Sequence, residues 1–155
     1  NGGTGWIYEM SFGNGGTSVD PTGIITYLTP NSTGTNASLY NQTYTKVVDD
    51  RSVNNIDPIR NKIETRHISG TNYTDILVSC LLDYGEPAGQ DAFDNATDES
   101  SSFIFDELGL RAFSSTGTGR LLTHVIFHPV QKSLNRLIQV DYTVRVQSLS
   151  GFNEV

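Results

Sequence analysis

The sequence contains a single cysteine, few charged residues and no long apolar run. The lone cysteine, Cys80, excludes an internal disulfide, and its place in the apolar run ILVSCLLDY predicts a buried, unreactive thiol. No stretch reaches the roughly 18 apolar residues of a membrane-spanning helix, and no basic and apolar leader indicates a signal peptide. We therefore expect neither disulfide chemistry nor a membrane partner.

Basic residues are also scarce, and they do not cluster. The chain has a formal net charge of -7. Nine acidic residues and no Lys or Arg lie between His67 and Leu110, whereas five basic residues face two acidic ones from Arg111 onward. Binding of nucleic acid depends first on clustered Lys and Arg that neutralise phosphates. Nucleic acid is therefore not an expected partner.

Motifs of catalysis and of metal or cofactor binding are missing as well. The glycine stretches NGGTG and GNGGT fit neither a P-loop nor a dinucleotide fingerprint, and there is no Gly-x-Ser-x-Gly elbow. On a strand, His124 and His128 of HVIFH would lie about 13 Å apart, too far to share a metal ion. The stretch DAFDNATDE lacks the order of an EF-hand, although an irregular calcium loop stays open. We expect no catalytic residue, no cofactor and no regular metal site.

What the sequence does contain is alternation of apolar and polar residues between turn signals. Only 36% of the residues are apolar, Gly is frequent, and no segment keeps an apolar period of 3.6. Short strands separated by Gly, Pro and Asn predict an all-β fold, an antiparallel sandwich or barrel, and we adopt an antiparallel β-sandwich with long loops. The expected strands are 6–12, 59–68, 75–84, 121–127 and 137–146. The range 75–84 is apolar on both faces, which predicts a central strand covered on both sides.

The length of 155 residues predicts one domain, residues 1–155. It would carry a glycine-rich N-terminal arm at about 1–5, an Asn- and Thr-rich loop at 29–45 and an acidic insertion at about 85–102. Loops on a rigid sheet commonly carry binding. These three segments are therefore the expected contacts with partners.

The stretch FIFDELGL, residues 103–110, places two acids beside a glycine. A carboxylate pair could serve acid-base catalysis. However, neighbouring residues of a strand point to opposite faces, so Asp106 and Glu107 could not easily share one substrate. We interpret the stretch as a corner where the acids bond the backbone and Gly109 lets the chain turn. Gly109→Val should then be damaging and Asp106→Asn mild.

The order of several short motifs carries a resemblance to a known family. MSFGNGGTSVDPTG, ASLYNQTYTKVVDD, a central strand, FIFDELGL, LLTHVIFHPVQKS and LIQVDYTVRVQ follow one another along the chain. Over about residues 6–147 this order resembles the attachment domain of phage tail-collar and tail-fibre proteins. The positions that match the family's motifs, and that the resemblance implies are needed for the fold, are Gly13, Gly15, Gly16, Leu39, Asn41, Tyr44, Glu107, Gly109 and Leu110.

The resemblance implies a non-enzymatic structural protein located in the virion. It would form a homo-oligomer, which we expect to be a trimer, and join other virion structural proteins as a collar, neck, baseplate or fibre-attachment component. The acidic connection at 85–102 is longer than the family usually has, so a capsid decoration protein stays an alternative. The expected interface pairs acids of the insertion with bases of a neighbouring copy, namely Asp91, Asp94 and Asp98 with Arg111, Arg120 and Arg136.

Two further functions stay open. One is a carbohydrate-binding β-sandwich for recognition of a host surface through the aromatic residues Trp6, Tyr40 and Tyr44. The other is a hydrolase with unrecognised acidic residues.

Overall fold

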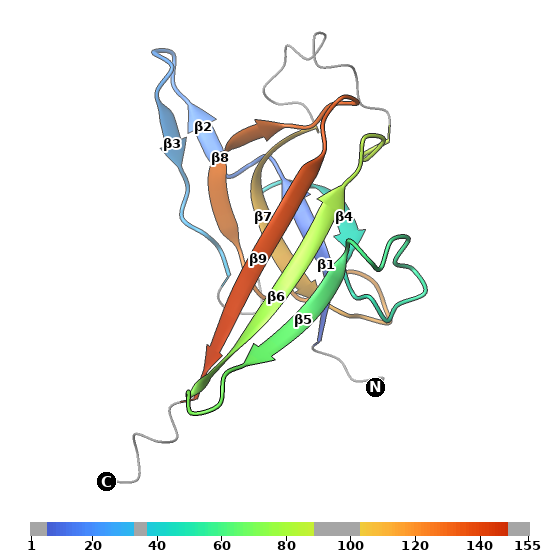
Figure 1. Ribbon diagram of the computed structural model, residues 1–155. Helices are drawn as coiled ribbons and strands as arrows, with labels where there is room; N and C mark the ends of the chain where they lie inside the picture. The colour runs from blue at the N-terminus through green and yellow to red at the C-terminus, as the bar shows by residue number, and fades with distance from the viewer. Residues whose placement is uncertain (1–5, 33–36, 89–102, 149–155) are drawn as a thin grey trace, which may run out of the picture.

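The computed structural model describes residues 6–32, 37–88 and 103–148, and in these ranges the chain is all-β (Figure 1). All strand pairs are antiparallel. The described part of the chain has no helix long and apolar enough to cross a membrane. The strands are β1 (Ile7–Gly13), β2 (Thr17–Val19), β3 (Ile25–Tyr27), β4 (Gln42–Val47), β5 (Lys62–His67), β6 (Tyr73–Leu82), β7 (Ile104–Ala112), β8 (Val125–Gln131) and β9 (Ile138–Gln147).

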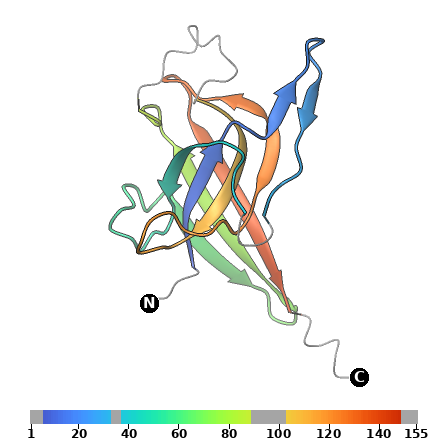
Figure 2. The ribbon, with the colours of Figure 1, turned by 180° about the vertical axis from the view of Figure 1, so that it is seen from behind.

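Two sheets pack face to face and confirm the predicted antiparallel β-sandwich. One has the strand order β4-β1-β7-β8, and the other has the order β5-β6-β9. Figure 1 shows β5, β6 and β9 as the nearer layer, and Figure 2 shows the molecule from behind, with the sheet of β1 and β4 nearer. Strands β2 and β3 form a separate hairpin that projects beyond the sandwich next to β8 (Figure 1).

The core lies between the two sheets and follows from the alternation along the strands. Met10 and Phe12 of β1 point inward together with Phe105 and Leu110 of β7. From the other sheet, the buried residues of β6 include Cys80, in agreement with its predicted burial. Because side chains alternate between the faces of a strand, every second residue of β9 from Ile138 to Val144 packs against this core. The partly buried residues of β9 are Ile138, Val140, Tyr142 and Val144.

The strands predicted from strong patterns lie within a few residues of their observed positions. The predicted strand 137–146 is β9, the predicted central strand 75–84 is β6, and β6 is indeed central in its sheet. The predicted strand 121–127 is placed too early, because β8 begins at Val125 and Leu121 makes only an isolated bridge to Arg111.

Two predictions about loops were wrong. The range 29–45 was expected to be a loop, but β4 begins at Gln42 and pairs with β1. The stretch FIFDELGL was expected to form a corner, but β7 continues through it from Ile104 to Ala112. Most of the acidic insertion, residues 89–102, and the arm at 1–5 lie outside the described residues.

Candidate functional site

The acidic residue Glu107 lies in the middle of β7, and its side chain is fully buried. One carboxylate oxygen, Oε2, accepts hydrogen bonds from the backbone N–H groups of Gly15 and Asn41, each at 2.9 Å. The other, Oε1, accepts from the backbone N–H of Tyr40 at 2.8 Å and contacts His124 Nε2 at 2.8 Å. A single carboxylate therefore joins the turn after β1, the segment before β4 and the segment before β8.

The contacts of His124 determine which of its ring nitrogens carries the proton. The backbone N–H of Asn31 donates to His124 Nδ1 at 2.7 Å. A backbone N–H can only donate, so Nδ1 is an acceptor and the proton lies on Nε2. Nε2 then donates to Glu107, which gives the carboxylate four donors in all.

The neighbouring Asp106 is buried as well, and it binds the same turn. Its Oδ1 accepts from the backbone N–H of Gly16 at 2.9 Å, and its Oδ2 accepts from the N–H and the hydroxyl of Thr17 at 3.0 and 2.6 Å. The register between β7 and β8 shifts between Phe105 and Glu107. At this irregularity the two neighbouring carboxylates bind consecutive backbone amides, those of Gly15 and Gly16. Both acids therefore anchor the turn that follows β1.

This arrangement gives the carboxylate pair a structural role. The side chains of Glu107 and His124 are both fully buried, and the Glu107 oxygens are occupied by donors of the chain itself. General acid-base catalysis needs a group within reach of a substrate proton, which these groups lack. The hydrogen bonds of Asp106 also argue against a mild effect of Asp106→Asn. The amide NH₂ group of Asn would face a backbone N–H donor at either oxygen position.

The glycines singled out in the sequence lie where chain segments approach too closely for a side chain. A Cβ on Gly13 would lie within 3.0 Å of Asn41 and Glu107, and one on Gly15 within 3.0 Å of Tyr40 and Asn41. A Cβ on Gly16 would lie 3.2 Å from Asp106. A Cβ on Gly109 would meet the backbone carbonyl of Thr123. Gly109 therefore permits a close approach of the segment before β8, and it does not act as a turn.

The other positions marked by the resemblance lie in two places. Leu39 and Asn41 lie beside Glu107 and Gly109, whereas Leu110 points into the core. Tyr44 packs on the core from β4, and its hydroxyl donates to Glu86 at 3.0 Å. Burial, together with the Glu86 carboxylate, raises the pKa of Tyr44.

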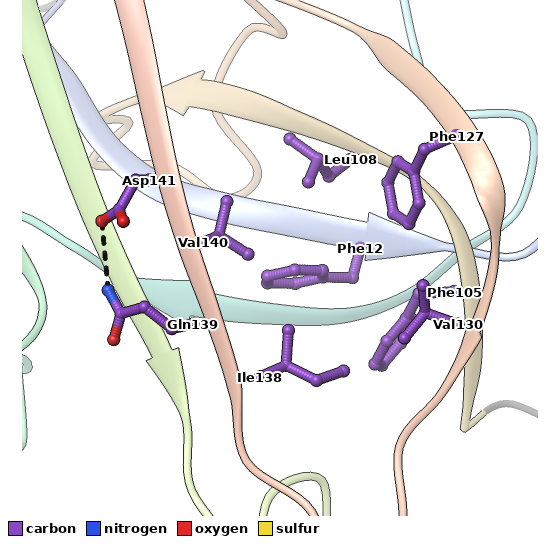
Figure 3. A pocket seen from close by; sticks show the side chains of 9 residues that line it. All are labelled: Phe12, Phe105, Leu108, Phe127, Val130, Ile138, Gln139, Val140 and Asp141. Carbon is purple, nitrogen blue, oxygen red and sulfur yellow. Dashed lines mark hydrogen bonds between the residues drawn. The ribbon is translucent and has the colours of Figure 1, made fainter.

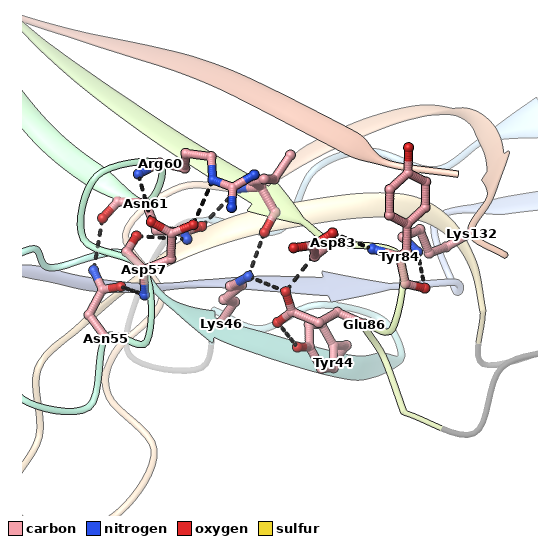
Figure 4. Close-up of polar contacts among 11 residues, drawn as sticks. Tyr44, Lys46, Asn55, Asp57, Arg60, Asn61, Asp83, Tyr84, Glu86 and Lys132 are labelled. Atoms are coloured by element: carbon pink, nitrogen blue, oxygen red, sulfur yellow. Dashed lines mark hydrogen bonds and ion pairs between the residues drawn. The ribbon is translucent and has the colours of Figure 1, made fainter. Parts of the chain in front are cut away.

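A second polar cluster, which the sequence did not predict, lies at the end of the sandwich near Glu86 (Figure 4). Lys46 of β4 is buried and donates to the backbone carbonyl of Leu81 and to the Glu86 carboxylate. Nearby, Lys132 donates to the backbone carbonyl of Tyr84 at 3.3 Å, and burial lowers its pKa. The alternation within β4 places Lys46 inward, but its partner lies 40 residues away and is invisible to local patterns.

The predicted charged interface is only partly described. Asp91, Asp94 and Asp98 lie outside the described residues, while Arg120 and Arg136 are exposed. Arg111 is only 8% exposed, and its guanidinium donates to Gln42 Oε1, Ser11 Oγ and the carbonyl of Gly119. The Arg111 charge is therefore buried and bound within its own chain, and the contact of the acids with bases of a neighbouring copy stays a prediction.

The three aromatic residues proposed for sugar binding are engaged separately. Trp6 stacks on Phe113 with ring centroids 4.6 Å apart and donates to Asp49. The Tyr40 hydroxyl donates to the carbonyl of Thr29, and Tyr44 is bound to Glu86. A shared aromatic platform is not formed by these three side chains.

An apolar groove of about 300 Å³ lies between the two sheets (Figure 3). Phe12, Phe127 and Val140 approach one another there, while the side chains of Gln139 and Asp141 lie on the other side of β9. The described residues contain no group of three or more His, Cys, Asp or Glu side chains that could hold a metal ion.

Comparisons of the chain with protein-family models, with curated proteins and with solved structures found no match.

Proposed function

We propose that this chain is a non-enzymatic structural protein of a phage virion that forms a homo-oligomer and joins virion parts. The proposed place is a collar, neck, baseplate or fibre attachment, with capsid decoration as the alternative. The resemblance of the motif order to tail-collar and tail-fibre attachment domains supports the family assignment. The observation that carries an assembly role is a well-anchored loop, residues 51–60, which presents aliphatic side chains to solvent.

Two buried asparagines hold this loop in place (Figure 4). Asn55 Nδ2 donates to the backbone carbonyls of Asp49 at 3.2 Å and Asn61 at 2.8 Å. Asn61 Oδ1 accepts from the backbone N–H of Leu81 in β6 at 2.8 Å, and its Nδ2 donates to the carbonyl of Asp57 at 3.1 Å. These bonds connect the loop to the sandwich and define its backbone.

The loop exposes large aliphatic side chains on this defined backbone. Val53 is 99% exposed, Ile56 79% and Ile59 80%. Scattered apolar side chains are normal on a protein surface, whereas large apolar patches are typical of protein-binding sites. These three are the most exposed large hydrophobic side chains of the described residues, and all lie on this one segment, which favours a binding role. Because the loop is already ordered, docking it loses less conformational entropy than docking a flexible segment. We assign the 51–60 loop to the contact with another virion protein.

The β2–β3 hairpin supports the same function. Two-stranded hairpins are marginally stable alone, and this one projects from the sandwich with Val19, Ile24 and Tyr27 about half exposed or more. Coverage of the hairpin by a neighbouring subunit would stabilise it. The burial of Glu107 and His124 within the fold also favours a structural role over the hydrolase alternative.

The proposal is tested by following the chain into particles. Virions would be assembled with the wild-type chain, with the variant Val53→Ser/Ile56→Ser/Ile59→Ser, and with Ile68→Ser as control, since Ile68 is exposed in the β5–β6 turn. Mass spectrometry of purified particles should find the wild type and the control and little of the triple variant. If the wild-type chain is not found in the purified particles, the virion assignment is contradicted. Equal incorporation of the triple variant would contradict the role of the loop.

A further inference from the structure

Strand β9 is a long strand at the edge of its sheet. It pairs with β6 over ten residues, from Ile138 to Gln147. No strand of the described residues pairs with its other edge, and Figure 1 shows β9 at the border of its sheet. The strand contains no proline and its pairing with β6 shows no bulge. Such edges pair readily with another chain unless they are protected.

The sequence of β9 is complementary to itself in an antiparallel pair centred on Thr143. In that register Asp141 lies opposite Arg145 of the second copy, and Arg145 lies opposite Asp141 of the second copy. Residues directly opposite each other in an antiparallel pair share a face of the sheet. On the inner face Tyr142 would therefore meet Val144, and Val140 would meet Val146.

Other registers lose this match. A shift by two residues in either direction places Asp141 opposite Thr143 or Gln147, without a charge partner. A shift by one residue turns the apolar face of one strand toward the polar face of the other. The alternation is clear in Figure 3, where Asp141 and Gln139 point away from the apolar groove and Ile138 and Val140 point into it.

The charged groups of this register are accessible on the surface. Asp141 is exposed, and the hydrogen bond from Gln139 Nε2 at 3.3 Å joins two side chains of the same face. Arg145 holds Asp75 of β6 through Nε at 2.8 Å and Nη2 at 3.1 Å, yet its side chain is 56% exposed. Its guanidinium can therefore lie between Asp75 on one side and an acid of a second copy on the other.

We propose that two copies of the chain pair through β9, antiparallel and with Thr143 opposite Thr143, to form a continuous six-stranded sheet β5-β6-β9-β9-β6-β5. The pairing satisfies the open backbone edge, aligns two Asp141–Arg145 contacts and covers Val146, which is 54% exposed in the single chain. This contact has two-fold symmetry, so it cannot by itself build the expected trimer; it builds a dimer, or a hexamer where a three-fold contact is also present. It rests only on the homo-oligomeric part of the proposed function.

Cysteine crosslinking tests the register directly. Opposite Cβ atoms in an antiparallel pair are about 4.5–5.5 Å apart, close to the separation that a disulfide needs. Thr143→Cys should therefore give a covalent dimer after mild oxidation, seen on a non-reducing gel. Gln139→Cys is the matched control, because the two copies of residue 139 would lie about 26 Å apart along the strands. Crosslinking of both variants to the same extent, or of neither, would overturn the proposed register.

Charge exchange provides a second test that does not depend on a disulfide. Asp141→Arg places Arg opposite Arg twice, and Arg145→Asp places Asp opposite Asp twice, so each variant alone should lose the dimer. An equimolar mixture of the two restores opposite charges at both places and should form the mixed dimer, measured by native mass spectrometry. Recovery in the mixture also shows that both variants are folded.

A dimer that persists in Asp141→Arg, or a mixture of folded variants that stays monomeric, would contradict the β9 contact. The outcomes for the two proposals are separable. An oligomer in solution without crosslinking of Thr143→Cys would reject the β9 pairing and leave the virion assignment intact. A crosslinked dimer that never enters particles would support the β9 pairing and reject the virion assignment.

Discussion

Replacing Glu107 with glutamine removes one acceptor from a buried side chain that receives four hydrogen-bond donors. Both oxygens of Glu107 receive two donors, namely Gly15 and Asn41 at one oxygen and Tyr40 and His124 at the other. In Glu107→Gln, the amide NH₂ group faces two donors in either orientation. Two hydrogen bonds are therefore lost, and buried N–H groups are left without an acceptor.

A change of tautomer at His124 does not relieve the conflict. If the new amide donated to Nε2, the imidazole proton would have to move to Nδ1. That nitrogen already accepts from the backbone N–H of Asn31, so the conflict would only move to the other side of the ring.

The size of the effect follows from these two bonds. Hydrogen bonds to a charged group contribute about 1.5–3 kcal/mol each, so the loss of two amounts to about 3–6 kcal/mol. Removing the charge returns part of the free energy spent on burying it. We expect a net loss of about 3 kcal/mol in the free energy of unfolding, which corresponds to a fall of about 6–12 °C in Tm for a domain of this size.

Urea unfolding followed by the fluorescence of Trp6, the only tryptophan, measures the change. The control is Glu64→Gln, since Glu64 is exposed and forms a surface ion pair with the partly exposed Lys62, and it should change stability by less than about 0.5 kcal/mol. A loss below about 1 kcal/mol in Glu107→Gln would refute the role given to this carboxylate.

Three other predictions concern stability and reactivity. Gly109→Ala should destabilise the fold by about 1–3 kcal/mol in urea unfolding, because its Cβ would meet the Thr123 carbonyl, whereas Gly85→Ala has open space and should be near neutral. Burial raises the pKa of the Cys80 thiol to about 12, so a thiol reagent at pH 8 should label it only after denaturation, and rapid labelling of the native chain would contradict its burial. The hydrogen bond from Arg145 holds the pKa of Asp75 below its ordinary 3.8. The wild type should thus have a larger free energy of unfolding than Asp75→Asn, with the full difference present above pH 3.8. This difference should disappear as the pH falls through the lower pKa of Asp75 in the folded state. A difference in urea unfolding that does not change with pH would contradict this prediction.

The strands that the sequence predicted well are those whose stability comes from an apolar face. β9 has such a face and β6 is apolar on both faces, and their observed bounds lie within two residues of the predicted ones. β4 was missed because the range 29–45 is dominated by Asn, Thr and Ser, whose side chains often bond their own backbone in loops. It is a strand because β1 supplies its backbone partners and Glu86 supplies the partner of the buried Lys46.

The sequence identified the residues around Glu107, but it could not predict how they are arranged in space. Asp, Glu and Gly are depleted in strands, so the middle of β7 looked like a turn. The donors that keep Glu107 inside a strand lie 66 and 92 residues away in the sequence, at Asn41 and Gly15. Local patterns cannot show such partners. The motif order had nevertheless marked Gly15, Asn41 and Glu107 together, and the fold brings these three into direct contact.

The mass of the purified chain in solution, measured by light scattering over a range of concentrations, tests the assembly role most directly. Since one chain has a mass of 17.0 kDa, the account predicts a defined multiple of this value, and an even multiple if β9 pairs as proposed. A mass of 17.0 kDa at every concentration would contradict the claim that this protein is an assembly component.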